Sequence, residues 1–167
     1  MAGAVGTVVA GLLAFYTAVS QGLLPAHADA TPPKLEKMIA RKALHAAIDR
    51  QAPQGPKPVA LNDANLIAGI KLYAADCAVC HGAADGKASH IALGLYQRAP
   101  QLAKHGVEDD EFGEIYWKIT HGIRLTGMPS FSKTLSEDDI RKVALFLQHM
   151  NSLPQAAKKA WDAVPSA

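Results

Sequence analysis

The chain has 167 residues, enough for one domain of ordinary size together with additional segments. Its formal charge of +2 at pH 7 is too small to indicate a nucleic-acid-binding protein. The charge is also uneven, because residues 31–60 carry six Lys and Arg against two Asp and Glu, whereas residues 61–153 carry nine against eleven.

The N-terminal segment, residues 1–26, has no charged side chain and consists mainly of Ala, Val, Leu and Gly. As a helix that rises about 1.5 Å per residue, it can cross the hydrocarbon core of ~30 Å. A cleaved signal peptide is the competing interpretation, since Ala26-His27-Ala28 and Ala28-Asp29-Ala30 both resemble cleavage sites. A signal peptide would begin with basic residues and have a shorter apolar core. We therefore predict a transmembrane anchor that is retained.

Residues 27–60 combine a predicted amphipathic helix with a linker. The helix is expected over 34–51, with Thr31 as a candidate N-cap and prolines before it. Its apolar residues recur with roughly the period of one helix face: Leu35, Met38, Ile39, Ala43, Leu44, Ala47 and Ile48. The other face is basic, which is consistent either with a solvated helix packed on the next domain or with a helix near anionic lipid or an acidic partner subunit. Three prolines within 52–58 predict a semi-stiff linker.

A helix that begins at Asn62 or Asp63 is predicted to lead directly to Cys77. Its apolar positions are Leu66, Ile67, Ile70, Tyr73 and Ala74. Gly69 interrupts this pattern at a cost of about 1 kcal/mol relative to Ala, so we expect close contact with another helix there.

The segment Cys77-Ala78-Val79-Cys80-His81 has the pattern C-x-x-C-H, by which a c-type haem is attached. Two thiols three residues apart lie on one helical turn, so both can form thioether bonds to one haem, with His81 on the same side. A redox C-x-x-C motif does not need the histidine, and a zinc site needs two more ligands. Because these are the only cysteines in the chain, a covalent haem is the stronger interpretation.

The remaining elements are predicted from capping and periodicity. Residues 82–97 are expected to form a loop, and 107–120 a helix with an acidic first turn. Residues 120–131 form a second loop. Ser136 opens a closing helix, and the tail, 154–167, is expected to add a short helix. The predicted buried positions are Phe112, Ile115, Tyr116, Ile119, Ile140, Val143, Ala144 and Leu147.

Over about residues 61–153 these landmarks resemble the class I cytochromes c. Pro100-Gln101-Leu102 is similar to the family's Pro-x-Leu turn, and Thr126-Gly127-Met128-Pro129 is similar to its distal loop. The resemblance implies an all-α fold around one covalent haem c, in which the helix with Gly69 and Tyr73 crosses the closing helix. It also implies that His81 and Met128 are the two axial iron ligands, that the Pro100 carbonyl accepts the His81 ring N–H, and that Leu102 packs on the haem.

Other roles remain open. A lone methionine is usually core filler, and His105 and His121 are rival ligands to Met128. Trp117 is a candidate donor to a haem propionate, as a tryptophan is in some relatives, with ordinary packing as the alternative. Arg124 is a candidate partner of a propionate or an exposed residue.

Two protein ligands leave no open position on the iron, which favours electron transfer and argues against an enzyme. A thioether ligand also favours a high reduction potential. We therefore predict a carrier between a dehydrogenase or quinol-oxidising complex and a terminal oxidase or another cytochrome, free or as a permanent subunit. A haem peroxidase or gas sensor with a labile Met128, and a structural subunit whose haem is a relay, are the alternatives.

The predicted location is the bacterial inner membrane, with the haem domain in the periplasm. Lys and Arg follow the apolar segment and none precede it, so the positive-inside rule would place the domain in the cytoplasm. We give the haem motif more weight, because in the class I cytochromes c the haem is attached on the far side of that membrane.

Overall fold

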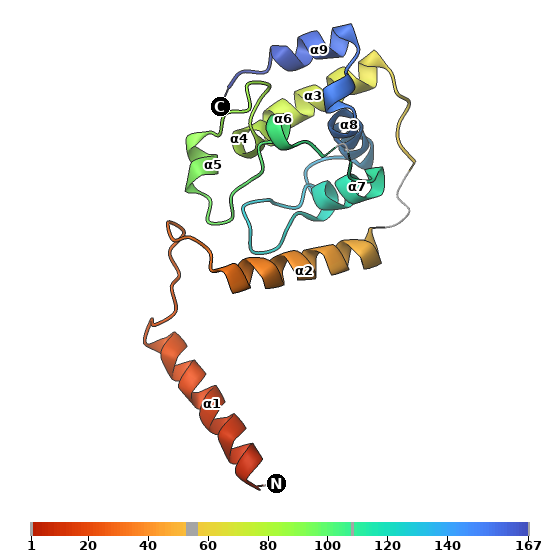
Figure 1. Cartoon of the computed structure of the whole chain (residues 1–167). Coiled ribbons are helices and arrows are strands. Elements are labelled where there is room, and N and C mark those ends of the chain that lie inside the picture. Colours follow the sequence, from red (N-terminus) through yellow and green to blue (C-terminus); the bar gives the residue numbers. More distant parts are fainter. Residues whose placement is uncertain (1, 53–56, 108, 167) are drawn as a thin grey trace. The chain divides into compact units, whose positions relative to one another are not determined.

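The computed structural model describes residues 2–52, 57–107 and 109–166, without the side chain of Ala2. Across these ranges the protein is helical and has no strand, which confirms the predicted all-α class. The chain divides into two compact units, residues 1–30 and 31–167 (Figure 1). Most of the predicted proline-rich linker, residues 53–56, lies outside the described residues.

The first unit contains one helix, α1 (Ala2–Ser20). Its segment Gly3–Ser20 is long and apolar enough to cross a membrane, a property that a signal sequence near an N-terminus shares. Three hydroxyl groups, those of Thr7, Thr17 and Ser20, donate to backbone oxygens four residues earlier. These bonds satisfy the polar side chains within the helix, so it can present a uniformly apolar surface.

Helix α2 (Lys34–Gln51) opens the second unit and has the predicted bounds. The predicted cap at Thr31 is wrong: Pro33 occupies the N-cap position, without a side-chain cap. The prediction of one apolar face is also wrong. Leu35, Met38 and Ile39 are exposed, whereas Leu44 and its neighbours Ala47 and Ile48 are half-buried or buried. Corresponding members of the two sets, such as Leu35 and Leu44, are nine residues apart, which is two and a half turns. The two sets of side chains therefore point in opposite directions.

The core of the second unit is built on the crossing of α3 (Asp63–Asp76) and α8 (Glu137–Gln148), as predicted. A Cβ atom at Gly69 would overlap the backbone oxygen of Lys142, so only glycine allows the two helices to approach this closely. Asn62 caps α3 by accepting the N–H of Asn65 at 2.9 Å, and Ser136 caps α8 in the same way.

Helix α9 (Gln155–Asp162) packs against α3 and completes this core, as predicted for the tail. Its residue Trp161 is buried and contacts two other rings, Tyr73 and Phe146, with centroid separations of 5.4 and 5.1 Å. Tyr73 and Phe146 also meet edge to face at 5.4 Å. This aromatic cluster joins three helices, so the tail is part of the folded unit.

Three short helices follow α3: α4 (Ala78–His81), which is the helical turn predicted for the cysteine motif, α5 (His90–Gly94) and α6 (Leu102–His105). The prediction that 82–97 is entirely loop is therefore wrong. Ser89 caps α5 by accepting the N–H of Ala92 at 3.0 Å, a signal that was present in the sequence. A single 3-10 turn, η1 (Met150–Ser152), follows α8.

Helix α7 (Phe112–His121) packs against α8 and starts later than predicted. Glu111 is its N-cap and Asp110 lies in the preceding turn, so neither belongs to its first helical turn; Glu108 lies outside the described residues. Asp110 is turned back to bind Lys118 of α7 at 2.8 Å. This ion pair holds Asp110 beside α7, outside the helix.

Candidate functional site

His81 lies at the end of α4, directly after the crossing helix α3. Its Nδ1 atom lies 2.9 Å from the carbonyl oxygen of Pro100. Because a carbonyl only accepts, Nδ1 must carry the proton, and the lone pair of Nε2 remains free to bind a metal. Burial lowers the pKa of His81, and the bond to Pro100 offsets this only in part, so the imidazole is neutral at pH 7.

The two cysteines are half-buried on the same turn. Burial, with smaller contributions from Asp76 and Cys80, raises the pKa of Cys77 to about 12. A redox C-x-x-C motif requires a thiol with a lowered pKa, since the thiolate is the nucleophile. The environment of Cys77 therefore disfavours disulfide exchange.

Buried hydrogen bonds fix the position of this turn. The Tyr73 hydroxyl donates to the carbonyl of Gly82 at 2.8 Å, and burial raises the pKa of Tyr73, so the group remains a neutral donor. The Gln101 amide donates to the carbonyls of Cys80 and Ala99 at 3.0 and 3.3 Å. The Pro100 turn is thus tied to the cysteine motif by a second bond besides that of His81.

Met128 is presented by a loop that folds back on itself. The Ile123 N–H donates to the Met128 carbonyl at 3.1 Å, and the Thr126 hydroxyl donates to the Ile123 carbonyl at 2.6 Å while accepting the Met128 N–H at 3.1 Å. Gly122 begins this loop at φ +67°, where an added Cβ would lie 2.5 Å from the Pro129 backbone. The conformation of this loop therefore depends on Gly122 where the loop begins and on Thr126 before Met128.

These two segments meet at one cavity of about 270 Å³. His81 and Met128 both line it, as do Cys77, Cys80 and Pro100. The rest of the wall is mainly aliphatic and aromatic: Leu44, Tyr73, Leu95, Leu102, Val107, Ile115, Ile119, Ile123, Phe131, Val143 and Leu147. The rival ligands His105 and His121 are exposed and do not belong to this wall.

A small number of charged side chains reach the same wall: Asp76, Arg98, Asp110 and Lys118. Lys118 is half-buried and binds both Asp110 and Glu114 at 2.8 Å. Burial alone would lower the pKa of Lys118, but the hydrogen bonds to these two carboxylates outweigh it and the pKa is raised. The lysine is therefore charged within this cluster at neutral pH.

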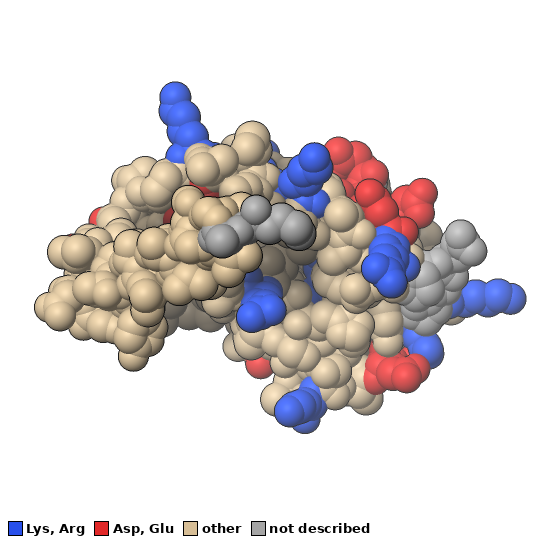
Figure 2. Space-filling model, turned by 90° about the horizontal axis from the view of Figure 1, so that it is seen from below, with Lys and Arg blue, Asp and Glu red and all other residues tan. Residues whose placement is uncertain are grey.

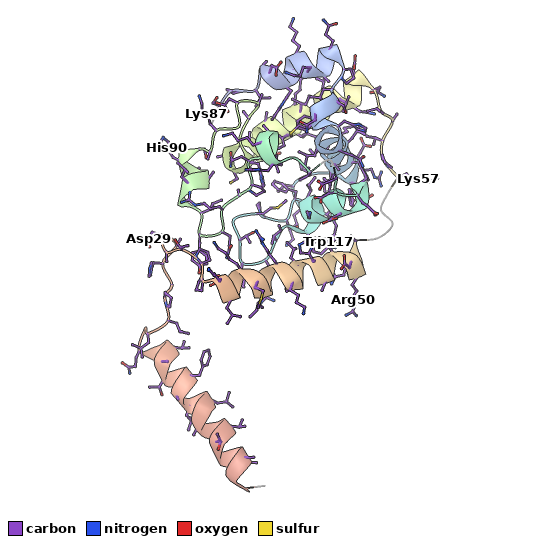
Figure 3. All side chains as sticks on the ribbon, in the orientation of Figure 1. Asp29, Arg50, Lys57, Lys87, His90 and Trp117 are labelled. Atoms are coloured by element: carbon purple, nitrogen blue, oxygen red, sulfur yellow. The ribbon has the colours of Figure 1, made fainter. Side chains whose placement is uncertain are left out.

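Trp117 and Arg124 are not brought to the cavity wall. Trp117 is half-buried on α7, next to α2, and its ring centre lies 5.0 Å from that of His121 (Figure 3). Arg124 is exposed on the loop that carries Met128. Contact of either residue with a haem propionate stays a prediction.

The residues of this cavity fit a haem. A neutral imidazole with a free Nε2, a thioether and two thiols line one apolar space, which is a donor set of the kind that holds haem iron and attaches the macrocycle. No group of three or more His, Cys, Asp or Glu within 2–52, 57–107 and 109–166 is placed to hold a metal ion.

Comparison with known protein families agrees with this geometry. The model of the family described as cytochrome c oxidase, cbb3-type, subunit III matches residues 64–147, just over half of the chain. The chain belongs to this family. Subunit III of the cbb3 type is a c-type cytochrome domain, so membership supports haem c and electron transfer. No solved structure gives a match to the chain.

Several residues of this cytochrome site were not identified from the sequence. Leu44 reaches the cavity from α2, and Gln97 and Arg98 from the segment before Pro100. The pairing of Glu114 with Lys118 has the spacing i, i+4 and was therefore readable. The role of Thr126 was also readable, because a threonine hydroxyl often bonds to the backbone two residues later in a turn.

Proposed function

We propose that this protein is a membrane-anchored, monohaem c-type cytochrome that transfers single electrons. Cys77 and Cys80 would attach the haem, and His81 and Met128 would bind its iron. Pro100 would hold the His81 ring and Leu102 would pack on the macrocycle. Trp117 and Arg124 remain candidates for the propionates. When bound, haem supplies one-electron exchange between ferric and ferrous iron.

One observation carries this proposal: His81, whose Nδ1 is held by the Pro100 carbonyl, and Met128 line the same apolar cavity. If His81 and Met128 both bind the iron, no position on it would remain for a substrate, which favours a carrier over an enzyme. The Met128 thioether and the aliphatic wall both favour the ferrous state, so a high reduction potential is expected. Because neither iron ligand would change during electron transfer, the structural reorganisation that accompanies it should also be small.

The partners follow from the family and from α1. A protein related to an oxidase subunit is expected to exchange electrons with a dehydrogenase, a quinol-oxidising complex or a terminal oxidase, as a free carrier or a permanent subunit. Anchoring by α1 would confine it to the plane of the membrane and raise its effective concentration near such partners. The proposal includes location at a bacterial inner membrane with the haem domain in the periplasm, and haem attachment on that side in the class I cytochromes c supports it.

The proposal is tested by counting electrons and searching for turnover. The full-length protein, matured with haem in a periplasmic host and purified in detergent, should titrate as a one-electron couple with one haem per chain. It should be reoxidised by membranes that contain a terminal oxidase and show no turnover with peroxide. Peroxide turnover, with an iron that binds external ligands without mutation, would favour the haem peroxidase or gas sensor instead.

A further inference from the structure

Helix α2 carries two copies of one apolar pattern on opposite faces. The inward copy, Leu44, Ala47 and Ile48, packs on the haem domain, and Ile48 is only 4% exposed. The outward copy, Leu35, Met38 and Ile39, is 57–62% exposed. Packing against the domain therefore accounts for the inward copy and leaves the outward copy exposed.

The outward copy cannot turn inward by rotation of the helix, because α2 is fixed at its N-terminal half. Glu36 accepts hydrogen bonds from Tyr96 and Gln97 at 2.8 and 3.2 Å, and it lies eleven residues before Ala47, close to three full turns and thus on the same face. Bonds to Glu36 and burial of Ile48 hold both ends of α2. Leu35, Met38 and Ile39 are then presented permanently to the outside.

Basic side chains surround this outward trio. Lys34, Arg41 and Lys42 are three or four residues from Met38, which makes them its neighbours on the helix surface, and all three are exposed. Arg50, further along α2, also points away from the domain (Figure 3). Figure 2, which views the molecule from below Figure 1, shows Lys and Arg projecting at several points among uncharged residues, with Asp and Glu in separate patches.

We propose that this outward face of α2 lies in the surface of an anionic lipid bilayer. Apolar side chains bordered by Lys and Arg are the features by which a helix binds in the headgroup region. Three apolar residues are too few for a stable protein interface, which takes about 20–30 residues on each side. Contact with a bilayer needs less apolar surface, because the covalent link to α1 would hold α2 near the membrane.

That tether follows from the covalent chain. Thirteen residues, 21–33, separate α1 from α2, and at ~3.5 Å per residue they reach roughly 45 Å at most. The inference thus rests on the proposed membrane anchoring by α1. With α2 in the bilayer surface, Leu44 on its opposite side would still line the haem cavity. The side of the cavity that α2 covers would therefore face the membrane. The contact would restrict the directions from which a redox partner can approach.

The test uses the full-length, haem-loaded protein in vesicles of phosphatidylcholine with or without phosphatidylglycerol. A nitroxide is attached at Met38→Cys or, as a control, at Lys159→Cys on α9, which is also exposed. Collisions with oxygen, which concentrates in lipid, are compared with those of a water-soluble nickel chelate. We expect the ratio of oxygen to nickel collisions to be several-fold higher at position 38 than at 159, and highest with phosphatidylglycerol.

Charge variants separate lipid binding from general attraction. Replacing Lys34, Arg41 and Lys42 by Gln should lower the ratio at position 38, whereas replacing Lys87, Lys133 and Lys159 by Gln should leave it unchanged. If the protein floats with the vesicles but position 38 stays as exposed to water as 159, the docking inference is overturned and the anchor stands. If the protein does not float, both fail. Spin–spin broadening between labels at 38, independent of lipid charge, would assign the face to a second copy and overturn the inference.

Discussion

At the scale of single residues, the site depends on small groups that orient the two ligand side chains. The Pro100 carbonyl selects the tautomer of His81 through a bond of 2.9 Å. On the other side, Thr126 both donates to Ile123 and accepts from the Met128 N–H. Thr126 is therefore a positioning residue, since its hydroxyl sets the backbone that carries the sulfur.

Replacing Thr126 by Val should loosen the Met128 loop, because valine has the same shape but neither donates nor accepts. We expect cyanide to bind the ferric protein about fivefold faster, which corresponds to about 1 kcal/mol for the hydrogen bonds lost. Thr126→Ser keeps the hydroxyl and should behave as the wild type. Equal cyanide rates in Thr126→Val and the wild type would show that this hydroxyl does not position Met128.

At the scale of helices, the crossing of α3 and α8 sets the floor of the cavity. Val143 and Leu147 of α8 line the cavity, and Tyr73 at the end of α3 both lines it and holds the motif turn. The closeness of this crossing depends on Gly69. This backbone contact therefore sets how closely the two helices that line one side of the cavity approach each other.

Gly69→Ala separates this contact from helix propensity. Propensity alone would make alanine more stable by about 1 kcal/mol, whereas a Cβ against the Lys142 backbone should destabilise the fold by about 1–3 kcal/mol. Gly94→Ala is the matched control, because no atom lies within 4 Å of a Cβ there. Unfolding in denaturant measures both variants, and a more stable Gly69→Ala would contradict the close crossing.

Helix α7 is tied to the segment before it by the ion pairs of Lys118 with Asp110 and Glu114. Since the folded-state pKa of Lys118 is raised, the cluster contributes its full stability below the ordinary lysine pKa of about 10.4 and loses it as pH rises through the folded value. Lys118→Met should lower the free energy of unfolding by about 1–3 kcal/mol at pH 7.

The pH dependence provides the control for that prediction. The difference between the wild type and Lys118→Met should be constant from pH 7 to about 10 and should shrink above it. A difference that stays constant to higher pH would mean that the lysine charge contributes nothing, and that the methionine changes packing alone.

At the scale of the whole molecule, sequence reasoning recovered the elements that carry strong local signals. The Asn62 and Ser136 caps and the bounds of α2 were readable from side-chain chemistry or period, whereas the crossing at Gly69 was implied by the resemblance to the class I cytochromes c. The membership of the cytochrome family agrees with the order of the motifs. Local chemistry was sufficient where the determinants lie within a few residues of one another.

Features that depend on contacts between distant segments were missed or misread. The apolar residues of α2 were assigned to one helix face. Residues nine positions apart are separated by two and a half turns, not by a whole number of turns, and so lie on opposite faces. The presence of Leu44 at the cavity could not be read, since it depends on α2 packing against the domain. Likewise, Asp110 was predicted to lie in a helix from the local preference for acidic residues in a first turn. Its bond to Lys118, eight residues away, overrides that preference.

The central claim is that His81 and Met128 bind the same haem iron. The most direct measurement is the midpoint potential of Met128→Ala beside that of the control Met38→Ala, whose side chain is exposed on α2. Axial ligands shift haem potentials over a range of about 0.8 V, so we predict that Met128→Ala lowers the potential by a few tenths of a volt and opens the iron to cyanide, while Met38→Ala changes neither. An unchanged potential in Met128→Ala would contradict the claim.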